Sequence, residues 1–254
     1  MKTAFLITAR LKSTRLPKKI LLEVAGKPLI VHMLDRIKRA LTIDKIIICT
    51  STNPQDDPLE EIAGQEQVSC FRGSEEDVLV RLLEAAQSHG LKYFANITAD
   101  CPMMDPLLID RAVLEYQKAD VDLLKYDDSN ADLPFNCYLI KVSALEKVCQ
   151  QKKEADTEVW LRYFTSNPLL KVKSIFVKDE YRHKILKTSL DYPEDYEFMK
   201  CVFSELDKPD TLFSILDVID LVKRKPGILN INANKDLTIR WLDHRQSIQD
   251  SIIK

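Results

Sequence analysis

Glycine is scarce in this chain, which has five glycines among 254 residues, and no two of them lie close together. This spacing excludes a G-x-G-x-x-G dinucleotide loop and a Walker A loop, because both motifs need clustered glycines where the backbone approaches a phosphate. If the protein binds phosphates, side-chain cations must therefore do more of the binding than backbone amides.

Other absences narrow the class of protein. The six cysteines form no C-x-x-C pair and the four histidines are scattered, so we expect no zinc site and a reducing compartment, the cytoplasm. The apolar run near the N-terminus is too short for a signal peptide, and no run reaches transmembrane length. A net charge of −2 creates no general attraction for nucleic acid or membranes, so we expect neither as a partner.

The first half of the chain alternates short apolar runs with segments of helical periodicity. The apolar runs predict buried strands, and the periodic segments predict helices. Strands that alternate with helices indicate a parallel sheet covered on both faces, which is an α/β fold. The predicted strands are 3–8, 45–50, 68–71, 93–97 and 121–126, and the predicted helices include 29–41, 75–88 and 105–118.

After residue 127 this alternation stops. Three further strands are predicted at 137–140, 170–177 and 185–190. The chain contains no internal repeat and no low-complexity linker, so we expect a single domain over residues 1–254 with a projecting insert at about 135–185. The predicted helices of this half are 143–152, 156–164, 193–205, 212–223 and 235–250.

A basic segment follows the first predicted strand. Residues 9–19 hold five Lys or Arg residues and two hydroxyl residues among eleven positions. Ligands of open parallel sheets bind beyond the carboxyl ends of the strands, where this segment begins. Arginine binds phosphate through paired donors and lysine binds it as a point charge. The segment is therefore a candidate phosphate-binding loop, and the alternative is a solvated basic turn.

Three more segments follow predicted strands and carry candidate ligands. Asp100 ends the fourth strand, and it is a natural Mg²⁺ ligand because Mg²⁺ takes one or two carboxylates beside phosphate and water oxygens. Its alternative is a turn or a helix cap, although Asp105 already caps the next helix. Asp191 ends a later strand, where an ordinary helix N-cap is the alternative. Arg72 could reach a base or a phosphate, and otherwise it is a surface arginine.

Taken in order, several segments resemble the CMP-sugar synthetase family of cytidylyltransferases, which includes the Kdo and acylneuraminate enzymes. The resemblance is closest to the spore-coat-polysaccharide SpsF-like branch. Each segment alone is a weak signal, but the ordered set spans roughly residues 3–200. The matching segments are Ala9-Arg10, Ser13-Thr14-Arg15-Leu16-Pro17, Lys19, Gly26-Lys27-Pro28-Leu29-Ile30, Phe71-Arg72-Gly73-Ser74, Asp77-Val78-Leu79 with Arg81, Thr98-Ala99-Asp100-Cys101-Pro102, Asp105-Pro106 and Leu190-Asp191-Tyr192-Pro193-Glu194-Asp195.

The resemblance implies a Rossmann-like, three-layer nucleotidyltransferase fold with a mostly parallel, mixed sheet of seven strands. It also implies a homodimer built partly through the insert. The implied reaction transfers CMP from CTP to a sugar or sugar-like acceptor, releases pyrophosphate and uses Mg²⁺. Matching positions assign metal binding to Asp100 and Asp191, and catalysis to Arg10, Lys19 and Asp100. The implied nucleotide-binding residues are Ala9, Arg10, Ser13, Arg15, Lys19, Arg72 and Thr98.

The chain departs from the family pattern at several positions. Lys18 and Ala99 stand where glycine is usual, so the backbone there must be unstrained or must tolerate strain. Asn136 replaces another glycine, and Thr157 and Val159 flank a glutamate where an Arg-Glu-His run is usual. These last departures lie on the acceptor side and leave the identity of the acceptor open.

Two alternatives to cytidylyl transfer to a sugar remain. The acceptor could be a phosphorylated alcohol or a sugar phosphate, with another nucleotide in place of CTP. The chain could also be a non-catalytic nucleotide-binding protein. Two residues of the acceptor side have alternative roles. Glu158 could touch the acceptor, but a place on a helix surface is favoured. Trp160 is expected in the core or at an interface rather than as a stacking platform.

Overall fold

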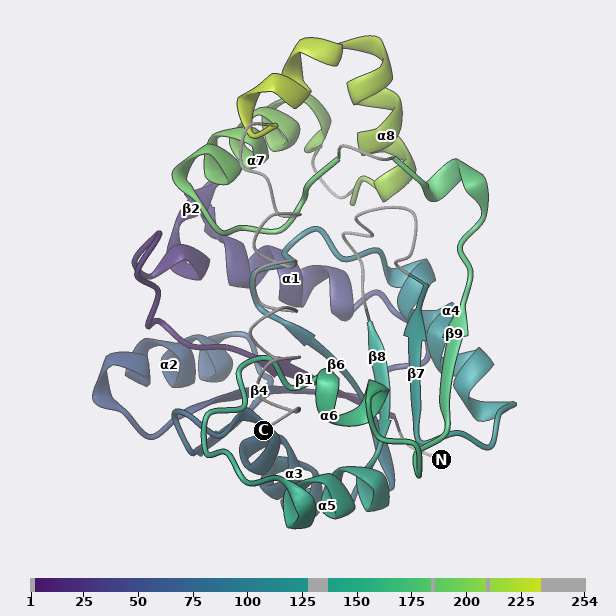
Figure 1. The fold of residues 1–254 in the computed structure, drawn as a ribbon. Coiled ribbons are helices and arrows are strands. Elements are labelled where there is room, and N and C mark those ends of the chain that lie inside the picture. Colours follow the sequence, from purple (N-terminus) through teal and green to yellow (C-terminus); the bar gives the residue numbers. More distant parts are fainter. Residues whose placement is uncertain (1–2, 128–136, 184–185, 209–210, 234–254) are drawn as a thin grey trace, which may run out of the picture.

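A mixed sheet of seven strands runs through the middle of the molecule in the computed structural model (Figure 1). The model describes residues 3–127, 137–183, 186–208 and 211–233. The strand order is β5-β4-β1-β6-β8-β7-β9, and a separate ribbon pairs β2 with β3. The strands are β1 (Ala4–Thr8), β2 (Glu23–Val24), β3 (Lys27–Pro28), β4 (Lys45–Ser51), β5 (Ser69–Gly73), β6 (Tyr93–Thr98), β7 (Leu123–Tyr126), β8 (Tyr138–Lys141) and β9 (Val172–Ile175).

The parallel half of the sheet brings the ends of distant strands together. β1 lies parallel between β4 and β6, and its last residue, Thr8, is in register with Cys49 and Thr98. β5 continues this half beyond β4, also in parallel. The loops that follow these strands therefore leave the sheet at the same edge, as the alternation of strands and helices predicts.

The second half of the sheet is mixed. β8 is antiparallel to both β6 and β7, whereas β9 is parallel to β7 and forms the edge. The part of segment 135–185 that the structure describes thus supplies β8 and β9 to the main sheet. α5 (Val142–Gln151) packs against α3 (Val78–Ser88), and both helices lie below the sheet in Figure 1.

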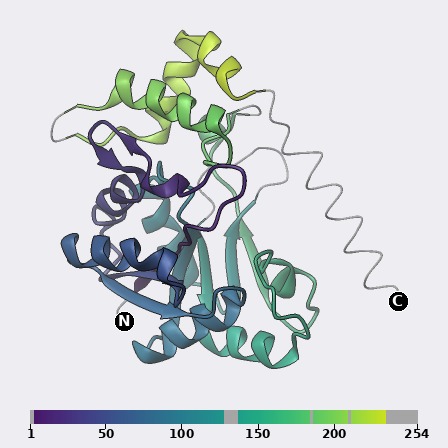
Figure 2. The same ribbon diagram turned by 90° about the vertical axis from the view of Figure 1, so that its left-hand side faces the viewer.

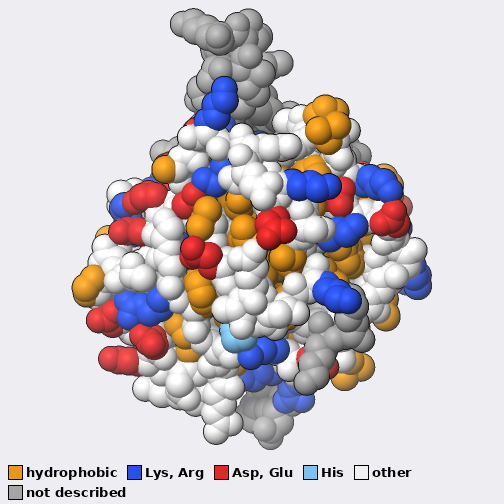
Figure 3. Space-filling view, turned by 90° about the horizontal axis from the view of Figure 1, so that it is seen from below, with side chains coloured by type: hydrophobic (Ala, Val, Ile, Leu, Met, Phe, Trp, Pro, Cys, Tyr) orange, Lys and Arg blue, Asp and Glu red, His pale blue; other side chains and the backbone are white. Residues whose placement is uncertain are grey.

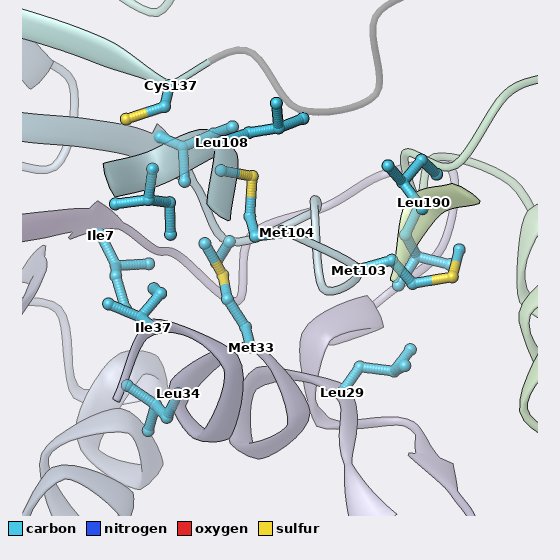
Figure 4. Packing of buried hydrophobic residues seen from close by; sticks show 14 of the residues in the cluster. Ile7, Leu29, Met33, Leu34, Ile37, Met103, Met104, Leu108, Cys137 and Leu190 are labelled. Carbon is cyan, nitrogen blue, oxygen red and sulfur yellow. The ribbon is translucent and has the colours of Figure 1, made fainter. Parts of the chain in front are cut away.

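Helices cover both faces of the sheet, which makes three layers. Alternate side chains of β1 point into opposite layers. Phe5 and Ile7 belong to the apolar cluster of α1 (Leu29–Ile37), α2 (Asp57–Gln65) and α4 (Pro106–Gln117). Ala4 and Leu6 join the cluster of α3 and α5 instead. Figure 4 shows the first cluster, in which Ile7 lies close to Ile37. The expected three-layer fold with a mixed seven-stranded sheet is confirmed.

The C-terminal helices form a cap on one side of these layers. α7 (Pro193–Leu206) and α8 (Ile215–Arg224) lie at the top of Figures 1 and 2, opposite α3 and α5. A 3₁₀ helix, η4 (Pro226–Ile231), packs against both of them. The opposite face of the molecule, below α3 and α5, carries lysine, arginine, aspartate and glutamate side chains interspersed (Figure 3). No helix within the described ranges is long and apolar enough to cross a membrane.

Two predicted elements are corrected by the structure. Residues 186–190 belong to no strand, although they run beside the site and Leu190 N–H donates to the carbonyl of Asp100 at 2.8 Å. The helix predicted at 156–164 is reduced to the single turn α6 (Arg162–Thr165). Residues 158–161 form turns before it, and the Thr157 backbone and hydroxyl bind residues at the start of α3. The helix predicted at 235–250 lies outside the described residues.

Candidate nucleotide and cation site

The basic loop is held at its start by a buried carboxylate. Ala9 N–H donates to the carbonyl of Cys49 at 3.1 Å, and Leu11 N–H donates to Asp56 Oδ1 at 2.8 Å. Asp56 is completely buried and also accepts from the Ser51 hydroxyl. A loop that lacks glycine is thus fixed by a side chain forty-five positions further along the chain.

Lys18 adopts the left-handed backbone conformation that glycine would adopt without strain. Its φ is +52° and its ψ is +29°, and its carbonyl accepts from Leu21 N–H to begin the 3₁₀ helix η1 (Lys19–Leu21). Ala99, the other position where glycine is usual in the family, is not among the described residues with positive φ. The first departure therefore carries backbone strain and the second does not.

The turn at Lys18 directs Lys19 into a site between two carboxylates. Lys19 Nζ lies 3.0 Å from Asp100 Oδ2 and 3.2 Å from Asp191 Oδ1. It also donates to the carbonyl of Leu190. The Lys19 and Asp191 side chains are each 13% exposed and that of Asp100 is 25% exposed, so these charges are only partly screened by water.

Further cations surround Asp191. Arg15 Nη2 lies 2.9 Å from Asp191 Oδ1, and Lys187 Nζ lies 3.5 Å from Asp191 Oδ2. Burial would raise the pKa of Asp191, but Lys19, Lys187 and Arg15 together hold it below its ordinary value. Burial would likewise lower the pKa of Lys19, but Asp100 and Asp191 raise it above its ordinary value. Both groups are therefore charged at neutral pH.

A pocket of about 280 Å³ opens beside this cluster. Of the predicted site residues, Arg10, Ser13, Arg15, Lys19, Thr98 and Asp100 line it. Asp191 is not among the lining residues, but it pairs with two of them, Lys19 and Arg15. Ala9 is buried behind the loop and is not part of the lining. The structure thus brings together residues from the ends of β1 and β6 and from the segment before α7.

Arg72 lies elsewhere. Its guanidinium bonds to the carbonyl of Ser51 at 2.9 Å and forms ion pairs with Asp57 at 2.6 Å and Glu60 at 2.9 Å, both on α2. These contacts tie β5 to α2, and Arg72 does not line the pocket. The structure therefore does not join Arg72 to the other predicted nucleotide-binding residues.

The pocket also has an acidic and aromatic wall, to which Glu76, Glu158 and Trp160 belong. Arg10 donates to the carbonyl of Glu75 at 2.7 Å and pairs with Glu158 at 3.2 Å, and Lys12 pairs with Glu76 at 2.8 Å. Glu158 lies in a turn and lines the pocket, so the expected place on a helix surface is wrong.

Trp160 has two roles in this wall. It is 5% exposed and packs edge-on against Tyr138 and Phe164, with ring centroids 5.0 and 5.9 Å away, so its expected place in the core is confirmed. It also lines the pocket. No periodicity marks Trp160 or Glu158 as pocket residues, because the turn that carries them is held by Thr157 through contacts with α3.

The donor set fits a divalent cation that arrives with a phosphate ligand. Within the described ranges, no cluster of three or more His, Cys, Asp or Glu side chains could hold a metal ion alone. Asp100 and Asp191 offer two carboxylates that face one ammonium group. Mg²⁺ usually binds one or two carboxylates and takes its other ligands from phosphates and water. The Lys19 ammonium is here the positive charge between the two carboxylates.

Fold and site together define an α/β protein with a pocket of cationic and carboxylate side chains beyond the ends of its parallel strands. The chain belongs to the cytidylyltransferase family, whose family model matches residues 4–208. It is therefore a nucleotidyltransferase of the CTP-dependent kind, as the resemblance in its sequence implies.

Several relatives match the chain over about half or more of its length. The uncharacterized protein MJ1063 of Methanocaldococcus jannaschii is 30% identical over 238 residues, which cover 92% of this chain and 96% of that protein. The spore coat polysaccharide biosynthesis protein SpsF of Bacillus subtilis is 27% identical over 237 residues, 87% of this chain and 94% of its own. The 3-deoxy-manno-octulosonate cytidylyltransferase of Geobacter sulfurreducens is 29% identical over 113 residues, 44% of each chain.

Solved structures agree with the fold. A cytidylyltransferase from Leptospira borgpetersenii superposes with a TM-score of 0.81 at 28% identity, covering 93% of this chain and 99% of its own. A CMP:2-keto-3-deoxy-manno-octonic acid synthetase solved with CTP has a TM-score of 0.64 at 17% identity, with 81% and 99% covered. A Mycobacterium tuberculosis protein solved with manganese has a TM-score of 0.55 at 14% identity, with 78% and 97% covered. The last two show the fold alone.

Proposed function

We propose that the chain transfers CMP from CTP to a hydroxyl of a sugar or sugar-like acceptor at the pocket beside Lys19. The acceptor oxygen forms a bond to the α-phosphorus of CTP while the bond from that phosphorus to the β-phosphate oxygen breaks. Pyrophosphate leaves, and the hydroxyl proton is released to solvent. The observation that carries the proposal is the position of Lys19 between Asp100 and Asp191, at the mouth of a cation-lined pocket.

The cations of the loop bind the triphosphate. Arg10, Arg15 and Lys19 come from one short segment and line one pocket, so they can neutralise charge on the leaving pyrophosphate. The hydroxyl groups of Ser13 and Thr98, which line the same pocket, are donors for phosphate or ribose oxygens. In the free protein Arg15 and Lys19 pair with Asp191, and Arg10 pairs with Glu158, so these cations lie at the pocket and turn from their carboxylate partners to bind the triphosphate.

Asp100 and Asp191 would hold a divalent cation, Mg²⁺ under cellular conditions. When bound, the cation neutralises charge on the phosphate oxygens of CTP. The chain's own contribution is to keep the Asp191 carboxylate ionised. For Asp191 this is supported by a pKa below the ordinary value, which Lys19, Lys187 and Arg15 maintain against the effect of burial.

Assembly, domain organisation and compartment belong to the same proposal. All six cysteines are free thiols, which supports the reducing cytoplasm as the compartment.

We assign residues 1–254 to one nucleotidyltransferase domain that acts as a homodimer. Leu107 and Leu114 on α4 and Phe176 after β9 are exposed apolar side chains. The helix α4 lies beside the edge strand β9 (Figure 1). Sedimentation equilibrium, with Leu114→Lys as the disrupting variant, tests the dimer.

Pyrophosphate release tests the reaction. The purified chain is incubated with each of the four nucleoside triphosphates, with Mg²⁺ or Mn²⁺, and with a panel of neutral sugars, acidic sugars, sugar phosphates and phosphorylated alcohols. Release from CTP with a sugar acceptor is the expected result, and Asp100→Asn should abolish it while leaving the fold intact. Lys27→Met, which breaks a surface pair with Asp35 at 2.9 Å, is the control.

The same panel separates the alternatives. Release only with a phosphorylated acceptor, or with a nucleotide other than CTP, would replace the proposed substrates and keep the fold's reaction type. Tight CTP binding without release for any acceptor would indicate a non-catalytic nucleotide-binding protein. Release at the wild-type rate by the Asp100 variant would contradict the proposed site itself.

A further inference from the structure

A buried polar network lies directly behind Asp191, away from the pocket. Asp195 is 0% exposed, Asn232 is 3% exposed and Lys187 is 6% exposed. Lys187 Nζ donates to Asp195 Oδ2, and Asn232 Nδ2 donates to Asp195 Oδ1 at 3.1 Å. Asn232 Nδ2 also lies 3.1 Å from the carbonyl oxygen of Lys187, so the three residues close a ring of contacts.

This network contacts both the backbone and the side chain of Asp191. The same Asp195 Oδ2 accepts from the backbone N–H groups of Asp191 and Tyr192, each at 2.9 Å. Lys187 Nζ lies 3.5 Å from Asp191 Oδ2. The Tyr192 ring lies beside Lys187 and Arg15, with their cationic groups 5.3 and 5.0 Å from its centroid. Asp195 and Lys187 therefore hold Asp191 on the side away from the pocket, and Asp191 Oδ1 remains paired with Lys19.

Capping α7 does not by itself require this arrangement. The next helix, α8, begins with the same kind of capping box, in which Asp217 Oδ2 accepts from Ser214 N–H at 2.7 Å. That box lies at the surface and uses neither a buried lysine nor a buried asparagine. Burying an ammonium and a carboxylate opposes folding, so an exposed cap would start α7 at lower cost. The burial of Lys187, Asp195 and Asn232 therefore indicates a role other than capping α7.

The positions of the charges indicate that role. Arg15 and Lys19 face the pocket and are able to turn toward a triphosphate, which would leave the Asp191 carboxylate to a cation. Lys187 stays with Asp195 behind the loop, because both are buried and paired. Asn232 comes from the C-terminal end of η4, so a distant part of the chain holds this pair in place.

We infer that Lys187, Asp195 and Asn232 are positioning residues that hold Asp191 in the geometry a divalent cation requires. This inference rests on the proposed function of Asp191 as a cation ligand. Groups that orient a metal ligand from behind typically change metal affinity by about 10–100-fold when removed. The effect should therefore appear in metal binding and not only in folding.

The test compares two cap aspartates, Asp195 at the network and Asp217 at the surface. Binding of Mn²⁺ is measured by electron paramagnetic resonance with saturating CTP, for the wild type, Asp195→Asn and Asp217→Asn, alongside the midpoint of thermal unfolding. We expect the unfolding midpoint to fall in both variants. We expect Mn²⁺ affinity to fall by about 10–100-fold only in Asp195→Asn. Raising Mn²⁺ should restore its rate of pyrophosphate release.

Asn232→Ala is the second variant, for the case in which Asp195→Asn does not fold. It removes the hydrogen bond to Asp195 and leaves the Lys187–Asp195 ion pair in place. It should weaken Mn²⁺ binding in the same direction. Equal Mn²⁺ affinities in the folded network variants and in Asp217→Asn would overturn this inference alone. Failure of the wild type to bind Mn²⁺ together with CTP would overturn the proposed function, and this inference with it.

Discussion

Replacing Lys19 by methionine should change two binding reactions in opposite directions. Lys19 Nζ lies 3.0 Å from Asp100 and 3.2 Å from Asp191, so it occupies the position between the carboxylates that a divalent cation would share. In the free protein the ammonium competes with that cation. Once CTP is present, the same ammonium can move to the phosphates and assist binding. Methionine keeps the apolar stem and removes only the charge.

The size of the competition follows from the distances. Two unit charges about 4 Å apart interact by about 1 kcal/mol in bulk water and by about 4 kcal/mol near a protein surface. A divalent ion doubles these values, so removing the Lys19 charge should favour metal binding by at least about 2 kcal/mol, or more than tenfold. Turnover of CTP should fall by about 10²–10³, because an electrostatic contact to the phosphates is lost.

Isothermal titration of the free protein with Mn²⁺ and kinetics of pyrophosphate release measure the two effects. Lys27→Met serves as the control, since Lys27 pairs with Asp35 at 2.9 Å on the surface and does not line the pocket. Mn²⁺ binding by free Lys19→Met that is unchanged or weaker than in the wild type would refute the reasoning, because the ammonium would then not occupy the cation position. An unchanged turnover would refute the assigned role toward CTP.

Three further predictions concern stability and binding. Lys18→Gly should raise the free energy of unfolding by roughly 0.5–1 kcal/mol, because φ is +52° at this position, whereas Lys18→Ala should bring no gain in a urea titration. The pKa of Asp191 is lowered on folding, so its ion pairs stabilise the protein above about pH 4 and this stabilisation is lost as pH falls through the folded pKa. Asp191→Asn should therefore flatten the acid side of the stability profile, and an unchanged profile would contradict this. Arg72→Gln should lower the unfolding midpoint and leave the KM for CTP unchanged, since its partners lie on α2; a raised KM with an unchanged midpoint would place Arg72 at the nucleotide.

Elements that bury a continuous apolar run were predictable from the sequence. The first five predicted strands appear within a few residues as β1, β4, β5, β6 and β7. Four of them bury apolar side chains on both faces of the sheet, whereas β5 is only half-buried. The segment 185–190 is also predicted as a strand, but it carries three polar residues in a row and forms no strand in its described part. Lys187 in its middle turns inward to a buried carboxylate, and its Leu190 backbone bonds to Asp100 instead of to a neighbouring strand.

The candidate site was predictable only in part. Arg10, Ser13, Arg15 and Lys19 share one loop after a strand, and Asp100 ends another strand of the same half-sheet, so parallel topology alone brings them to one edge. Local spacing favoured a helix surface for Glu158 and the core for Trp160, and it did not place either residue in the pocket. Their place in the pocket depends on Thr157, whose N–H donates to the Glu76 carbonyl at 3.2 Å and whose hydroxyl accepts from Leu79 N–H at 3.0 Å.

By itself, the sequence determined the alternation of buried strands and helices, the shortage of glycine and the cationic loop that takes its place. These properties depend on neighbours in the chain, and local spacing is enough to show them. Only the tertiary structure decided which charges meet. Lys19 contacts carboxylates 81 and 172 positions away, and the lysine, aspartate and asparagine behind Asp191 become one network only after burial removes water as their partner.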